Sequence, residues 1–382
     1  MNPMSIVHSL VPGGPVGGNT LLAGLLVLVG LVLGTRLCHG VLRRRRERVL
    51  ILGESPLGRQ VIHAIERLAY RRYTIVGVVD NAGNLGRVIE AARPDRIVVA
   101  LAERQGDLPL GRLVESLARG IVVEDVAEIY ERLTGTLALE ALSPSRVIFS
   151  HDFRTSRLQH AIARALGLLV SVIGLIVLTP VLGAIVLLIK LESRGPALFI
   201  QERVGRSGRA FKLIKFRTMH PVNTPKSEWE RDNYDRITRL GRWLRRFRLD
   251  EVPQLVNVLR GDMNLVGPRP HPVTNLQLLT LAARNLNEQT GDALPYYALR
   301  CAVRPGITGW AQIRYGYAND LDEETEKMRY DLYYIKHMSL WFDLRILFDT
   351  ARIVVFGSSR SATAATWRGV TAKARLSPDV NR

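Results

Sequence analysis

Two adjacent carboxylates, Asp250 and Glu251, follow a basic run and come just before a predicted short helix. Pro253 suits the first turn of that helix, and Gly261 suits its end. Free N–H groups at a helix N-terminus favour negative charge, so either acid alone could be an ordinary capping residue. Two acids in tandem exceed what a cap needs. In phosphoryl transfer, one carboxylate can attack phosphorus while its neighbour holds a divalent cation that neutralises phosphate oxygens.

Cationic side chains accompany these acids along the chain. Lys215 and Arg217 lie in an extended segment of alternating character and are expected to share one face of a strand. Arg248 comes two residues before the first acid, and Arg269 lies in a Pro-Arg-Pro bend. A basic run is often a solvated face or a patch for anionic lipid headgroups. Its closeness to two carboxylates suggests recognition of a phosphorylated substrate.

The composition points to an anionic partner. The 382 residues carry a formal net charge of +18, which would suit nucleic acid, a phosphorylated metabolite or an acidic membrane surface. Cys38 and Cys301 lie far apart in the sequence. They predict a reducing compartment, with neither a disulfide framework nor a zinc site.

An apolar stretch at residues 20–42, after an N-terminal tail of residues 1–19, is long enough to span a bilayer. Arginines at residues 43–48 follow it at once, so we expect the N-terminus outside and the rest of the chain in the cytoplasm. The alternative is a cleaved signal peptide. It is disfavoured because the basic cluster follows the apolar run instead of preceding it.

A second apolar stretch, residues 160–190, has basic residues at both of its ends. A spanning helix would place one end outside the cell, against the positive-inside rule. Thr179 and Pro180 lie near the middle, where proline removes a backbone hydrogen bond and a threonine hydroxyl can satisfy a freed carbonyl. We therefore predict a re-entrant helix that breaks at Thr179-Pro180.

Strand and helix patterns alternate over residues 47–135, which predicts a small Rossmann-like parallel sheet. The dinucleotide fingerprint there is incomplete. Gly53 and Gly58 hold its outer positions, but Ser55 replaces the middle glycine that lets the backbone approach a pyrophosphate. Asp80 does end the second strand, where a ribose-binding acid would lie. We expect a structural or regulatory domain that binds no dinucleotide for catalysis.

Two other functions compete with phosphoryl transfer at this point. An NAD-dependent nucleotide-sugar enzyme anchored to the membrane would use the Rossmann-like domain, although the missing middle glycine argues against it. A membrane scaffold or nucleic-acid binder would explain the positive charge. It leaves the tandem acids unexplained, so we expect no nucleic acid partner.

Four separated segments then match a known family. The segments are "KFRTMH", "RLDEVPQLVNVLRGDMNLVGPRP", "VRPGITGWAQIRYGY" and "YDLYYIKHMSLWFDLRIL". They resemble motifs of the bacterial sugar transferases, the monotopic polyprenyl-phosphate phosphoglycosyl transferases. The resemblance covers residues 155–356, with the motifs in the family's order. The preceding region resembles the larger, exopolysaccharide-type members. Those usually have several N-terminal spans, whereas we find one here.

The resemblance implies a reaction. A sugar 1-phosphate would pass from a UDP-sugar to a polyprenyl (undecaprenyl) phosphate at the cytoplasmic face of the bacterial inner membrane, with release of UMP. This is the first membrane step of exopolysaccharide or other glycoconjugate synthesis. The partners implied are the UDP-sugar, the polyprenyl phosphate and inner-membrane lipids. The identity of the sugar, the glycan and the oligomeric state, including a possible homodimer, stay open.

The resemblance also implies roles for single residues. By the family's pattern Asp250 is the nucleophile that forms a covalent phosphosugar intermediate. Glu251 would help to bind Mg²⁺ and to position the phosphate, and both acids are candidate metal ligands. The candidate substrate-binding residues lie in the same motifs: Lys215, Arg217, Arg248, Pro268, Arg269, Pro270, Arg304 and Gln312.

Three further positions match the family's pattern. Arg304 is the candidate for contacts to the nucleotide. Asp331 and Asp343 match as well, and whether they are metal-linked or structural is left open. The family breaks its re-entrant helix at a Ser-Pro pair, and Thr179-Pro180 occupies that place here, with a hydroxyl that can do the same.

Together these features predict an α/β membrane protein. Its parts are an N-terminal transmembrane helix, a small Rossmann-like parallel-sheet domain, and a mainly helical monotopic catalytic domain with a re-entrant membrane helix. Residues 357–382 are rich in Ser, Ala and Arg and are expected to be disordered.

Overall fold

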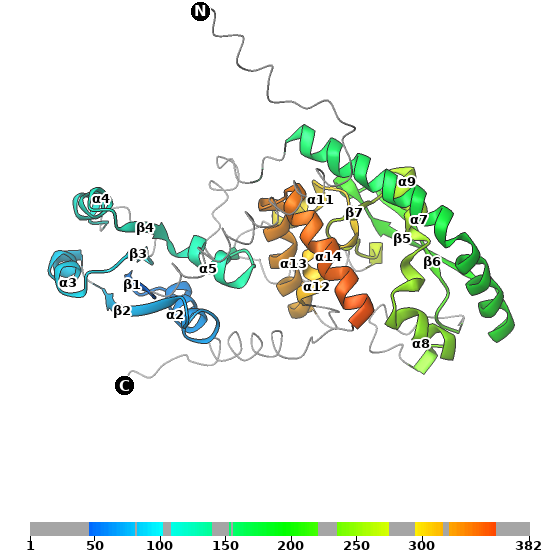
Figure 1. Ribbon diagram of the computed structural model, residues 1–382, viewed down its shortest axis with the longest axis horizontal. Coiled ribbons are helices and arrows are strands. Elements are labelled where there is room, and N and C mark those ends of the chain that lie inside the picture. The colour runs from blue at the N-terminus through cyan, green and yellow to red at the C-terminus, as the bar shows by residue number, and fades with distance from the viewer. Residues whose placement is uncertain are drawn as a thin grey trace, which may run out of the picture. The chain divides into compact units, whose positions relative to one another are not determined.

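The computed structural model describes residues 46–80, 82–101, 108–139, 153, 156–220, 235–274, 295–315 and 321–356 (Figure 1). The predicted transmembrane helix at 20–42 and the two predicted tails, 1–19 and 357–382, lie outside the described residues. The chain forms two compact units. Of the described residues, one unit takes those up to 54 and those in Ile65–Glu124, and the other takes Ser55–Ala64 and those from 125 to 356.

The first unit contains a four-stranded sheet with the strand order β2-β1-β3-β4. Its central strand β1 (Glu47–Leu52) pairs in parallel with β2 (Tyr73–Val79) and with β3 (Arg96–Val99), while β4 (Val122–Asp125) lies at the edge. This unit also contains the helices α3 (Leu85–Ala92) and α4 (Leu110–Ala118), with a 3₁₀ turn η3 (Ala82–Asn84) before α3. Helix α2 (Pro56–Leu68) follows β1 along the chain, and its residues up to Ala64 belong to the second unit. The predicted parallel sheet is therefore confirmed.

The glycines of the incomplete fingerprint have local roles. Gly53 has φ +98°, and a Cβ there would lie 2.8 Å from the Leu101 side chain, so this glycine allows close packing after β1. The Ser55 hydroxyl accepts a hydrogen bond from the Gly58 amide at 3.0 Å. One N–H near the start of α2 is thus already used, which is consistent with the expectation that no dinucleotide binds there for catalysis.

Helix α5 (Val126–Thr134), which lies within the residues 47–135 of the predicted Rossmann-like domain, belongs to the second unit. Glu131 of α5 forms an ion pair of 2.9 Å with Lys336, and the Gly135 carbonyl accepts a hydrogen bond of 2.7 Å from the Trp310 indole. Periodicity alone could not reveal this, because α5 follows the last strand as a helix of the first unit would.

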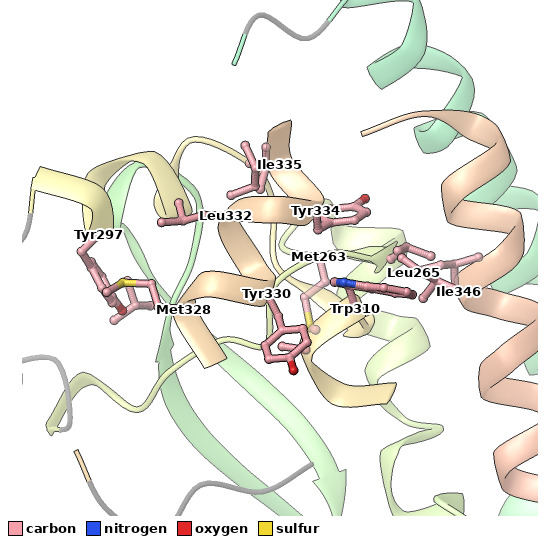
Figure 2. Packing of buried hydrophobic residues seen from close by; sticks show 14 of the residues in the cluster. Met263, Leu265, Tyr297, Trp310, Met328, Tyr330, Leu332, Tyr334, Ile335 and Ile346 are labelled. Atoms are coloured by element: carbon pink, nitrogen blue, oxygen red, sulfur yellow. The ribbon is translucent and has the colours of Figure 1, made fainter. Parts of the chain in front are cut away.

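The core of the second unit is rich in aromatic residues (Figure 2). It forms between the parallel strands β7 (Asn264–Val266) and β8 (Gly306–Thr308) and four helices: α11 (Pro295–Cys301), α12 (Trp310–Arg314), α13 (Leu321–Lys336) and α14 (Leu340–Phe356). The Trp310 ring lies 5.0 Å from that of Phe342 and 6.3 Å from that of Tyr333, between centroids. These contacts tie α12 to α13 and α14.

The predicted membrane helix is α7 (Arg157–Glu192), which has 36 residues and is slightly longer than the expected 160–190. It is the one helix, among the described residues, that is long and apolar enough to cross a membrane. Pro180 lies inside this helix, and the predicted break at Thr179-Pro180 stays a prediction. The Thr179 hydroxyl does donate to a carbonyl, that of Leu175, at 2.6 Å. Pro180 frees the next carbonyl, that of Ile176, so the expected pairing is shifted by one residue. Re-entry itself stays a prediction.

Both ends of α7 are attached to the same unit. Near its start, the Arg164 guanidinium donates to the carbonyls of Val258, Leu259 and Met263 around the end of α9 (Gln254–Arg260). Figure 1 shows α9 beside α7. Near the other end of α7, buried isoleucines pack in one cluster with side chains of β6 (Ala210–Phe216) and α8 (Arg239–Arg246): Ile185, Ile189, Phe216 and Leu244.

A single asparagine fixes α9 against the antiparallel hairpin of β5 (Leu198–Val204) and β6, which a 3₁₀ turn η5 (Arg206–Gly208) joins. Asn257 is fully buried. Its Oδ1 accepts from the Ile214 amide at 3.0 Å, and its Nδ2 donates to the Lys212 carbonyl at 2.8 Å and to Asp262 at 3.1 Å. This amide therefore sets the position of the strand that carries Lys215 relative to the helix that follows the two acids.

We expect Asn257→Ala to lower the free energy of unfolding by about 3 kcal/mol, because the Ile214 amide, the Lys212 carbonyl and the Asp262 carboxylate each lose a partner. Chemical denaturation of the detergent-solubilised protein, followed by tryptophan fluorescence, measures this. Gln159→Ala is the control, since it removes only an exposed capping-box contact at the start of α7 and should cost about 1 kcal/mol or less. Equal losses in the two variants would contradict the role given to Asn257.

Candidate active site

Asp250 and Glu251 lie on a single 3₁₀ turn, η7 (Leu249–Glu251), between α8 and α9. Arg248 precedes the turn with φ +54°, a left-handed conformation that is unfavourable for a residue with a side chain. It redirects the chain after α8 so that both acids point inward. Asp250 is 8% exposed and Glu251 is 6% exposed. Two buried neighbouring carboxylates need compensating positive charge, since burial of an unpaired charge is costly.

Glu251 receives that charge from two arginines. Its Oε1 accepts a hydrogen bond of 2.9 Å from Arg269, and its Oε2 lies 3.6 Å from Arg248, too far for a hydrogen bond. Burial opposes ionisation, but Arg269 and Arg248 outweigh it and hold the pKa of Glu251 below its usual value. The buried Oε2 has no hydrogen-bond partner in the described part of the chain, so this oxygen can take a further ligand.

The pKa of Asp250 is shifted in the opposite direction, upward. Burial and the neighbouring Glu251 raise its pKa to about 6, against the pull of Lys215, Arg245 and Arg269. Lys215 is partly buried, and its ammonium lies 5.0 Å from the centre of the Phe199 ring. Burial and neighbouring arginines lower the pKa of Lys215 to about 8. Near neutral pH, an ionised Asp250 therefore faces a protonated Lys215.

The Pro-Arg-Pro bend lies directly after β7. The Gly306 amide donates to the Pro268 carbonyl at 2.9 Å, and an Arg203 guanidinium N–H donates to the Pro270 carbonyl at 3.2 Å. A Cβ on Gly267 would lie 2.6 Å from the Arg304 carbonyl, so the bend packs tightly against the segment leading into β8. The two prolines act through backbone shape and place Arg269 against Glu251.

Two predicted binding residues lie away from the acids. The buried Arg217 guanidinium donates to the carbonyls of Ser193 and Arg194 at 2.8 and 3.1 Å, where it closes the C-terminal end of α7. The Arg304 Nε donates to the Gly261 carbonyl at 3.0 Å. Gly261 follows the C-terminal end of α9, whereas the two acids precede its N-terminal end. Lys215, Arg248 and Arg269 are brought together at the site. Substrate binding by Arg217 and Arg304 stays a prediction.

Gln312 of α12 is only 3% exposed. Neither its amide nitrogen nor its amide oxygen has a hydrogen-bond partner among the residues that the structure describes. A buried carboxamide without partners is unusual in native proteins. This state is consistent with the predicted role in substrate binding, because a ligand could use both atoms.

Asp331 and Asp343, whose roles the sequence left open, each have a hydrogen-bond partner in the protein. Asp331 accepts a hydrogen bond of 2.8 Å from the Arg300 Nε, and Asp343 accepts one of 2.8 Å from the Tyr334 hydroxyl. Within the described ranges, no three His, Cys, Asp or Glu side chains gather in a way that could hold a metal ion. Asp250 and Glu251 therefore have no third side chain of these kinds beside them in the described part of the chain.

Two cations near the acids were not among the predicted site residues. Arg245 acts on both Asp250 and Lys215, and Arg203 of β5 acts on Lys215. The spacing of Arg245 and Arg248, three apart, was the available signal for the first. Arg203 lies far from the acids in sequence, and only the hairpin brings it close.

Comparison with known proteins agrees with these features. The family model "Bacterial sugar transferase" matches residues 158–357. An Aeromonas hydrophila protein named UDP-N-acetylgalactosamine-undecaprenyl-phosphate N-acetylgalactosaminephosphotransferase is 38% identical over 272 residues, which are 70% of this chain and 60% of that protein.

Two further relatives act on glucose according to their names. The UDP-glucose:undecaprenyl-phosphate glucose-1-phosphate transferase of Escherichia coli (strain K12) is 33% identical over 82% of this chain and 68% of its own length. The undecaprenyl-phosphate glucose phosphotransferase of Komagataeibacter xylinus is 33% identical over 86% of this chain and 63% of its own length. The chain thus spans about three fifths to two thirds of these relatives. It belongs to the bacterial sugar transferase family.

Proposed function

We propose that this protein transfers a sugar 1-phosphate from a UDP-sugar to undecaprenyl phosphate and releases UMP. The buried Asp250–Glu251 pair, enclosed by Lys215, Arg248 and Arg269, carries the proposal. The names of the relatives support the two substrates. None of these relatives is named as an NAD-dependent enzyme, and that alternative has no support from the fingerprint region.

Asp250 is the nucleophile of the proposed reaction. Its carboxylate attacks the phosphorus that carries the sugar, and the bond from that phosphorus to the bridging oxygen breaks, so that UMP leaves. The product is a covalent aspartyl phosphosugar. A phosphate oxygen of the polyprenyl acceptor then attacks the same phosphorus and frees Asp250. Lys215, Arg245 and Arg269 offset the charge of the phosphate groups, because such transfer depends mainly on positioning and electrostatics.

Enzymes of this family typically depend on a metal ion, and we propose Mg²⁺. The residues fit this ion. The buried Glu251 Oε2 has no hydrogen-bond partner in the described residues, and Mg²⁺ usually binds through one or two carboxylates together with substrate phosphates. Asp250 and Glu251 would hold it, and when bound it would neutralise charge on the phosphate oxygens.

The site would lie at the cytoplasmic face of the bacterial inner membrane. Both ends of α7 contact one compact unit, which favours a helix that enters and leaves lipid on one side. Its outer residues are apolar, with Ile176 and Val177 70% and 64% exposed. On α14, Trp341 and Phe356 are also exposed and could contact lipid, while Asp343 and Ile346 of the same helix are buried. The homodimer stays a prediction.

We expect Asp250→Asn to abolish UMP release, by roughly a thousandfold or more, because the amide is not a nucleophile. The assay supplies the detergent-solubilised protein with undecaprenyl phosphate, Mg²⁺ and a panel of UDP-sugars. Asp343→Asn is the matched control, since it makes the same change at another buried acid and retains an oxygen for the Tyr334 hydroxyl. Full activity in the Asp250→Asn variant would exclude the covalent mechanism.

The rate of UMP release should fall at both low and high pH, so its pH profile should have an acid limb and a basic limb. Below a pH of about 6 it falls, since Asp250 becomes protonated and loses its nucleophilic lone pair. Above a pH of about 8 it falls again, since Lys215 loses the charge that attracts phosphate. Initial rates of UMP release between pH 5 and 9.5 measure both limbs.

Lys215→Arg distinguishes the origin of the upper limb. An arginine keeps its charge over the whole range, so the decline above a pH of about 8 should disappear in this variant. A decline that persists unchanged in Lys215→Arg would assign that limb to another group.

A further inference from the structure

The bend that carries Arg269 is held by its backbone oxygens. The carbonyls of four consecutive residues, 268–271, each accept a hydrogen bond from a donor outside the bend. The donors, in the order of these carbonyls, are the Gly306 amide at 2.9 Å, the Arg300 guanidinium, the Arg203 guanidinium at 3.2 Å and the Val204 amide at 2.9 Å. Prolines at 268 and 270 restrict the backbone further.

Arg300 holds the carbonyl of Arg269 itself. It comes from α11 and is 5% exposed, and its Nε donates to Asp331 of α13 at 2.8 Å. Its Nη2 donates to the Arg269 carbonyl. A guanidinium is planar and rigid, so an acid that fixes one edge also fixes the direction of the other. Asp331 therefore determines where Arg300 meets the bend.

The side chain of Arg269 contacts one of the two acids. Arg269 donates to Glu251 at 2.9 Å, whereas Arg248 lies 3.6 Å from that carboxylate, too far for a hydrogen bond. Displacement of Arg269 would therefore take from this buried carboxylate the cation that donates a hydrogen bond to it.

We propose that Arg300 and Asp331 are positioning residues, which hold Arg269 in its contact with Glu251 for the transfer reaction. They act through Arg269 and touch neither substrate nor metal. The catalytic part of this inference rests on the proposed function. A simpler alternative is that the buried ion pair only stabilises the fold.

The test replaces both partners at once. Removal of one partner would leave a buried unpaired charge and could unfold the protein, whereas apolar residues of similar volume at both positions are often tolerated. The variant is Arg300→Met combined with Asp331→Leu. Tyr334→Phe is the control: it removes a buried hydrogen bond from the same helix, α13, but this bond ends on Asp343 of α14 and not on the bend.

We expect the double variant to release UMP roughly tenfold more slowly than the unaltered protein, and Tyr334→Phe to stay within about twofold of it. Residues that act through Arg269 should add no further loss in a variant that already carries Arg269→Ala, because the contact they hold is then absent. A purely structural role would multiply the two losses. Multiplied losses, or an unchanged rate in the folded double variant, would overturn the inference and leave the proposed function intact.

A second measurement does not need turnover. Arginine labelled with ¹⁵N in its guanidinium reports the Arg269–Glu251 hydrogen bond by NMR, with the signal assigned from Arg269→Lys. The double variant should shift this signal toward that of a solvated arginine, and Tyr334→Phe should not. If the unaltered protein releases no UMP from any donor, the proposed function fails. The arginine spectrum then decides the positioning role alone, and an unchanged Arg269 signal overturns it.

Discussion

The structure of the second unit depends on one constraint: two adjacent carboxylates are buried, and buried like charges require cations at short range. The chain meets this requirement from separate elements. Lys215 comes from β6, Arg245 from α8, and Arg269 from the bend after β7. No single helix or strand could present all of them to one turn. The hairpin, the bend and the left-handed residue before η7 must therefore be held in register, and Asn257 and Arg300 supply contacts that do so.

The same environment gives the two acids different properties. Arg269 and Arg248 keep the pKa of Glu251 low, while Asp250 has its pKa raised by burial and by Glu251 itself. Neighbouring carboxylates whose pKa values are pushed apart commonly have separate roles in a reaction. Here the more strongly paired acid suits a metal, and the less strongly paired one suits attack on phosphorus. This difference in pKa results from the positions of the arginine guanidinium groups, because the two acids are both carboxylic acids and are chemically alike.

Helix α7, which is long and apolar enough to cross a membrane, is attached to this site. Arginines attach both of its ends to elements near the site: Arg164 to the end of α9, and Arg217 from the end of β6 to the carbonyls that close α7. Arg217 was expected to bind phosphate, and the structure shows it satisfying carbonyls that a helix end leaves without partners. In the proposed function, an apolar helix fixed in this way would keep the site close to the lipid surface that holds the acceptor.

The sequence alone determined the tandem acids, the parallel sheet, the apolar helix and the family, because each depends on residues close together in the chain: a motif, a periodicity or an apolar run. It could not decide the boundary before α5, since Glu131 meets Lys336 only through folding. Nor could it separate Arg269, which reaches Glu251, from Arg217, which does not, although both lie in basic motifs. The partners of Asp331 and Asp343 were equally hidden. Only the tertiary structure decided these points, because a side chain's role depends on which distant backbone and charges the packing brings within hydrogen-bonding distance.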